Sequence, residues 1–149
     1  MANYICTTRS NYFRVNDADG FVEFMDHIHG TEDDVGLWAK DVQTDSGVVK
    51  YYGFGCYGGI LGFLQNGDDY SDDEFDQAFD KFIDGLQKYV ADDDAVLIME
   101  SGFEKLRYVT GCVTIVTKDR CATIDMVLQA QHLASEFLED ETWSTQCTY

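Results

Sequence analysis

The first half of the chain alternates apolar and polar residues in short stretches, a pattern typical of strands. We expect one strand over residues 2–8, with residues 12–15 extending it or pairing with it. Two more strands are expected over 35–42 and 48–56, because the sequence QTDSG between them supplies the Asp, Ser and Gly of a turn.

The second half contains a short apolar run and another pair of strand-like segments. Residues 95–99 predict a buried strand. Residues 107–117 and 121–127, separated by 118–120, predict a hairpin. Strands joined by such short turns favour antiparallel pairing.

Three segments show helical spacing instead. Asn16 is a residue type favoured as an N-cap, and Gly30 is one that ends helices, which predicts a helix over 17–29. A last amphipathic helix is expected over 128–138. The apolar positions of the first helix are Phe21, Phe24, Met25 and Ile28.

The clearest helix follows Ser71. A serine followed by three acids suits a helix N-terminus, because its side chain can cap free N–H groups and acids complement the helix dipole. The residues that follow place one apolar stripe over about five turns. This stripe consists of Phe75, Phe79, Phe82, Ile83, Leu86 and Val90.

The order of these elements predicts an α+β fold with an antiparallel or mixed β-sheet and three helices, mainly on one face. We expect one domain over residues 1–138 and a polar C-terminal tail over 139–149, because no repeat or linker interrupts the pattern.

The charge balance changes the functional picture. The chain has 28 acidic residues against ten Lys and Arg, a net charge of −18. Such a field repels phosphate polymers and anionic lipid and attracts basic protein surfaces, so we expect no direct nucleic-acid or membrane binding. The first residues lack a basic flank followed by an apolar run, so we expect no signal peptide and a cytoplasmic location.

Half of the chain's excess of acidic over basic residues lies in the 27 residues 68–94. This segment holds eleven acids and two Lys, a net −9, and four of its Asp fall in one row of the expected helix at steps of 3, 4 and 4. The row is open to three readings: a solvated face, a surface that imitates nucleic-acid charge, or a calcium or magnesium site. The eleven acids are Asp68, Asp69, Asp72, Asp73, Glu74, Asp76, Asp80, Asp84, Asp92, Asp93 and Asp94.

Gly53, Gly55 and Gly58 spell the G-x-G-x-x-G phrase of dinucleotide-binding folds. The chain lacks the βαβ repeat that this motif requires, and the segment after it is too glycine-broken for a crossover helix. We therefore expect these glycines to permit a bulge or a close backbone approach.

The five cysteines contain no CxxC pair and are read as reduced thiols. Cys6, Cys112 and Cys121 fall in expected strands, where burial should slow their labelling, and Cys147 lies in the tail. A thiol enzyme using Cys56 would need a nearby base. A zinc site could draw on several Cys and His side chains, which are suitable ligands but show no recognised spacing. These candidates are Cys6, Cys56, Cys112, Cys121, His27, His29 and His132.

Three phrases, NYICTTRSNYFRV, GFGCYGGI and EKLRYVTG, resemble a family of small acidic proteins from phages and mobile elements of Gram-positive bacteria. The resemblance covers most of the chain and brings no catalytic motif with it. Such proteins are similar in kind to anti-CRISPR and antirestriction inhibitors, several of which occupy nucleic-acid sites on Cas effectors or restriction enzymes.

We therefore interpret the chain as a binding protein rather than an enzyme, with no cofactor and no metal. The hypothesis is an inhibitor of a bacterial defence nuclease, such as Cas9 or a restriction enzyme, that acts through the eleven acids as a nucleic-acid mimic. The alternatives are a zinc-stabilised accessory binding protein whose acidity serves solubility, and a small thiol enzyme using Cys56.

Overall fold

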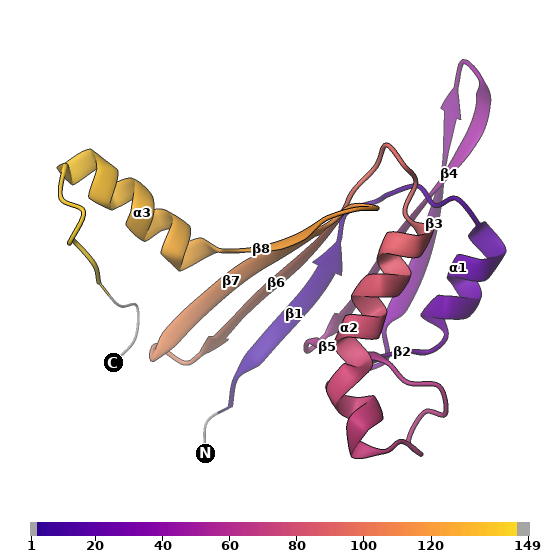
Figure 1. The fold of residues 1–149 in the computed structure, drawn as a ribbon, viewed down its shortest axis with the longest axis horizontal. Coiled ribbons are helices and arrows are strands. Elements are labelled where there is room, and N and C mark those ends of the chain that lie inside the picture. The colour runs from indigo at the N-terminus through magenta and orange to yellow at the C-terminus, as the bar shows by residue number, and fades with distance from the viewer. Residues whose placement is uncertain (1–2, 146–149) are drawn as a thin grey trace.

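The computed structural model describes residues 3–145, which form eight strands and three helices (Figure 1). The strands are β1 (Ile5–Ser10), β2 (Ile28–Gly30), β3 (Gly36–Thr44), β4 (Gly47–Tyr57), β5 (Ile60–Phe63), β6 (Val96–Glu104), β7 (Tyr108–Val116) and β8 (Cys121–Asp125). The helices are α1 (Ala18–Met25), α2 (Asp72–Tyr89) and α3 (Met126–Leu138).

Six of these strands form one sheet in the order β3-β4-β1-β6-β7-β8, and every neighbouring pair is antiparallel. The predicted α+β class with an antiparallel sheet and three helices is therefore confirmed. The two expected hairpins are present as β3–β4 and β7–β8. Strand β6 is longer than the expected 95–99, because it continues in register with β7 as far as Glu104.

The N-terminal segment differs in detail from the prediction. Strand β1 begins at Ile5 rather than at residue 2 and lies at the centre of the sheet. Residues 12–15 do not extend it. Instead Phe13 bridges to Tyr52 of β4, and Val15 bridges to Val90 at the end of α2.

The first helix is shorter than predicted. Asp17, not Asn16, is its N-cap, and its side chain accepts the N–H of Gly20 at 3.1 Å. The helix ends at Met25, because Ile28 enters β2 and pairs with Phe63 of β5 in a separate two-stranded sheet. The helical spacing of Ile28 thus reflects burial in the core rather than continuation of the helix.

Helices α1 and α2 cover the same face of the sheet, as Figure 1 shows. The core between these layers joins alternate residues of β4 and β6 to one side of each helix. Its aromatic members pack edge to face, as Phe54 does against Phe13 and Phe82. The largest fully buried side chains are Phe13, Phe21, Phe54, Phe82, Leu86, Val90, Val96 and Val116.

The other face of the sheet, here named the open face, has no helix layer in the described part of the chain. Strand alternation and register assign its side chains, since Arg9, Met99, Val113 and Ile124 lie in one row across four strands. The remaining large members are Ile5, Trp38, Lys40, Val42, Val49, Tyr51, Tyr57, Leu97, Phe103, Val109 and Ile115.

Helix α3 continues directly from β8 and projects beyond the edge of the sheet (Figure 1). No residue of this helix is buried. Residues that follow it return toward the helix, where Gln131 donates to the Thr145 carbonyl at 2.6 Å. Within residues 3–145, no helix combines the length and apolar character needed to cross a membrane.

Candidate functional site

The acidic segment is built on α2, which begins as the sequence predicts. Ser71 is the N-cap; its hydroxyl accepts the N–H of Glu74 at 3.3 Å, and the Glu74 carboxylate accepts the Ser71 N–H at 2.8 Å. This reciprocal capping box satisfies free backbone donors at the helix start. The two Ser71 donors, backbone N–H first, lower the pKa of Glu74.

The apolar stripe of α2 is buried only along part of its length. Phe82 and Leu86 are fully buried and Ala78 packs against β5, where any side chain at Gly62 would collide with the Ala78 backbone. Phe75 and Phe79, predicted to be part of the buried stripe, are exposed. Phe75 instead stacks on Tyr70, just before the N-cap of the helix.

Four aspartates form the acidic row on the solvent side of α2. All four are exposed, and none forms an ion pair within residues 3–145. They alternate with the buried positions at the helical period, so the same spacing that buries Phe82 turns the carboxylates outward. The row consists of Asp73, Asp76, Asp80 and Asp84.

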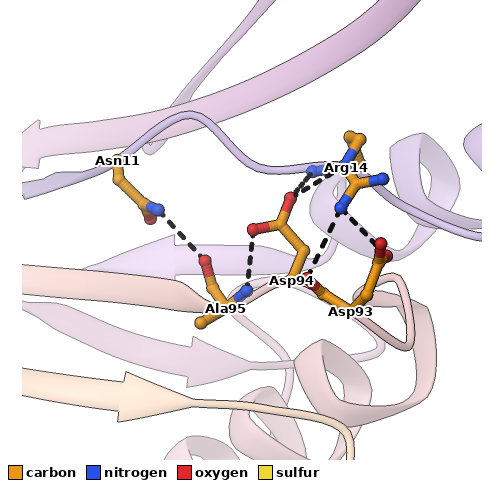
Figure 2. A network of polar contacts seen from close by, with 5 residues as sticks. All are labelled: Asn11, Arg14, Asp93, Asp94 and Ala95. Atoms are coloured by element: carbon orange, nitrogen blue, oxygen red, sulfur yellow. Dashed lines mark hydrogen bonds and ion pairs between the residues drawn. The ribbon is translucent and has the colours of Figure 1, made fainter.

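The last three of the eleven acids lie in a different environment, after the end of α2. Asp92 pairs with Lys118 at 2.9 Å. Asp93 pairs with Arg14 at 2.9 Å, and Asp94 accepts both the backbone N–H of Arg14 at 2.8 Å and its Nε at 3.2 Å (Figure 2). These carboxylates are occupied within the protein, whereas those of the α2 row are not.

The glycine-rich stretch serves the fold rather than a dinucleotide. Strand β5, not a helix, follows it, as expected from the missing βαβ pattern. A side chain at Gly55 would lie 2.7 Å from the Thr8 carbonyl of the neighbouring strand, and Gly58 has a positive φ of 86°. The expected close backbone approach is confirmed.

Three of the cysteines lie on the helix-covered face of the sheet around Glu100. Burial raises the pKa of Cys6, Cys56 and Cys112, and the nearby Glu100 carboxylate raises each further. Cys56 donates weakly to the carbonyls of Gly58 and Gly59. These thiols are therefore held in the protonated, weakly nucleophilic form.

The three cysteines expected to be buried in strands differ in exposure: Cys6 is buried, and Cys112 is only partly buried. Cys121 is exposed on the edge strand β8, so its predicted burial is wrong. Strand alternation alone could not reveal this, because it does not show that β8 lies at the border of the sheet. Cys147 lies outside the described residues. Within residues 3–145, no group of three or more His, Cys, Asp or Glu side chains is arranged to hold a metal ion.

A pocket of about 420 Å³ opens at the start of β3, on the open face. Its lining includes the aromatic residues Trp38 and Tyr57 and the acids Asp33 and Asp34. The guanidinium of Arg9 lies over the Trp38 ring, 4.6 Å from its centroid, in a cation–π contact.

Searches of protein-family models, of curated proteins and of solved structures find no match to this chain. The geometry of the site separates the acids of the α2 row, which face solvent unpaired, from Asp92, Asp93 and Asp94, which hold other parts of the fold together.

Proposed function

We propose that this protein inhibits a bacterial defence nuclease, such as Cas9 or a restriction enzyme, by presenting the acidic face of α2 to a basic nucleic-acid groove. It would act in the cytoplasm, where such nucleases meet DNA. The observation that carries the proposal is the row Asp73, Asp76, Asp80 and Asp84, which is exposed and free of ion pairs in the described chain.

The spacing of this row supports a polyanion-like role. Residues three and four apart on a helix are about 5–6 Å apart. Phosphates follow one another at a comparable interval, since B-DNA rises about 3.4 Å per nucleotide along a strand and also winds sideways. A groove that binds successive phosphates could therefore meet successive carboxylates of α2.

The helix is also a rigid platform for such a row. Its capping box fixes the first turn, and Phe82 and Leu86 anchor its far side in the core. Like charges at this spacing cost a few tenths of a kcal/mol per pair in an isolated helix. The buried side offsets that cost, so the charges need no internal counterion.

The surrounding charge supports a basic protein as the partner. A net charge of −18 repels nucleic acid itself and accelerates encounter with a basic surface. Catalysis has less support, because the raised pKa values of Cys6, Cys56 and Cys112 keep these thiols protonated near neutral pH.

The test begins with capture of the partner from bacteria that carry CRISPR and restriction systems. The affinity of the captured nuclease is then measured for the wild type and for a variant with Asp73, Asp76, Asp80 and Asp84 all changed to Asn. We expect binding to weaken by about tenfold or more at low salt, because each lost contact with Lys or Arg is charge-assisted. The loss should shrink as salt rises.

A control variant removes four exposed, unpaired charges outside α2 within the described residues, through Asp19→Asn, Asp26→Asn, Asp45→Asn and Asp119→Asn. Both variants carry a net charge of −14, because each raises the original −18 by four. Nuclease inhibition should survive in the control and fail in the α2 variant. Equal inhibition by the folded α2 variant and the wild type at low salt would refute the proposal, as would capture of no nuclease.

A further inference from the structure

The open face of the sheet carries large apolar side chains in contact with solvent. Met99 is 45% exposed, Phe103 48%, Val109 52% and Tyr57 71%. These residues come from β4, β6 and β7, so the apolar surface extends across the sheet rather than lying at one edge. Contiguous apolar surfaces of this kind mark interaction sites on water-soluble folds.

Among the strand residues, charge is sorted between the two faces of the sheet, and the acids Asp33 and Asp34 line the open-face pocket from the segment before β3. None of the chain's 28 acidic residues is among the strand side chains of the open face. Its two charged strand residues, Arg9 and Lys40, are basic, and both lie over aromatic rings of the same surface. The helix-covered face carries acids, among them Glu100 and Asp125.

Helix α3 is a second apolar surface without a partner. Phe137 is 81% exposed, and Leu128, Leu133 and Leu138 are each at least half exposed. A helix of 13 residues is marginal in water without tertiary packing. The helix begins on the open-face side, because the Met126 side chain lies against Gly111 of β7.

We propose that a second copy of this chain covers the open face, forming a two-fold dimer in which α3 of each copy contributes to the interface. An isologous contact is satisfied by one patch that meets itself, and the open face and α3 are both present on each copy. The acidic row of α2, which lies on the opposite face of the sheet, would then point away from the interface.

The exposed area fits a stable dimer. Aromatic side chains expose about 150–250 Å² when fully accessible, so half-exposed large side chains leave roughly 100 Å² each. Eight of them on and beside the open face approach the roughly 800 Å² per partner of a standard interface. These eight are Ile5, Tyr12, Trp38, Tyr57, Met99, Phe103, Val109 and Ile124.

Charge complementarity also favours a second copy over a different occupant. The end of α3 and the residues after it carry Glu136, Glu139, Asp140 and Glu141, whereas Arg9 and Lys40 are the charged strand residues of the open face. A copy that places its α3 across this face brings acids toward bases. The open face of one copy and α3 of the other then bury each other's apolar side chains, as packed layers of a domain do.

Sedimentation equilibrium over a range of protein concentrations tests the proposal without any nuclease. The wild type should sediment as a dimer that dissociates on dilution. Val109→Glu, on the open face, should raise the dimer dissociation constant by about a hundredfold or more, because two unpaired charges enter the interface. The matched control is Val48→Glu, at an exposed position on the other side of the sheet, which should leave it unchanged.

A wild type that stays monomeric at all concentrations would overturn the proposal. An equal increase in the dimer dissociation constant for Val109→Glu and Val48→Glu would also overturn the proposal. Circular dichroism confirms that each variant is folded, and the concentration series on the wild type stands even if a variant unfolds. A monomeric protein that still binds a nuclease through α2 would separate this inference from the proposed function.

Discussion

Asp94 joins the segment after β1 to the start of β6 through one carboxylate. One of its oxygens accepts the backbone N–H and the Nε of Arg14, and the other accepts the N–H of Ala95 at 2.8 Å (Figure 2). Asn11 completes the junction, because its side chain bonds the Ala95 carbonyl at 3.0 Å and the Leu97 N–H at 2.8 Å. The exit of β1 is thereby fixed to the start of β6.

Replacement of Asp94 by Ala should therefore lower the free energy of unfolding. The change leaves the Arg14 and Ala95 N–H groups without this acceptor, at a cost of about 1–3 kcal/mol. Asp93→Ala is the control, because its side chain is 77% exposed against 22% for Asp94, and exposed pairs contribute about 0–1 kcal/mol. Urea denaturation measures both, and equal midpoints for the two variants would contradict this assignment.

The sequence alone could not separate Asp94 from its neighbours. Asp92, Asp93 and Asp94 are chemically identical and adjacent, and their roles depend on Lys118 and Arg14, which are distant in sequence. Only the sheet topology brings those bases close. The acids of α2, by contrast, could be placed on one exposed face from their spacing alone.

At the level of single elements, α2 has the strongest local signals. Its cap, its first-turn acids and its periodic core positions agree, so the predicted start at Ser71 matches the structure. Helix α1 was predicted too long, because Ile28 satisfies helical spacing and strand burial equally well. The pairing of β2 with β5, which decides between the two, is a tertiary contact that no local pattern encodes.

Ser71→Ala should destabilise the protein by about 1 kcal/mol, since the cap of α2 is lost. The effect should depend on pH through Glu74, whose pKa is lowered in the folded state. The stability that the ionised Glu74 carboxylate contributes is fully present above its pKa in the unfolded chain, and it is lost as the pH falls through its lower pKa in the folded protein. Urea denaturation of the wild type and of Ser71→Ala at a series of acidic pH values should show that their difference in unfolding free energy becomes smaller as the pH falls. A difference that does not change with pH would exclude coupling to Glu74.

For the whole molecule, the excess of acids predicts a particular response to salt. Self-repulsion among charges summing to −18 opposes the compact state, and ions screen it. The free energy of unfolding should therefore rise when NaCl increases from about 0.02 M to about 0.5 M at fixed protein concentration. The rise should be smaller for the four-Asn variant of α2, and a fall with salt would show that internal ion pairs outweigh the repulsion.

The open face is the feature of the whole molecule that the sequence did not predict. In segments such as 107–117, apolar residues point to both faces of the strand. Such a pattern is compatible with a sheet buried on both faces and with a sheet covered on one face only. The number and position of the helices decide the outcome. Both α1 and α2 lie on the same face, so the apolar residues of the other are left at the surface.

The central position of β1 also sets an order of assembly during synthesis. Thr7 pairs with Tyr57, but Ile5 pairs with Phe103, 98 residues farther along the chain. At about 5–20 residues per second, β6 leaves the ribosome roughly 5–20 s after β1. Strands β3, β4 and β1 can join first, and β1 stays an edge strand until β6, β7 and β8 arrive to enclose it.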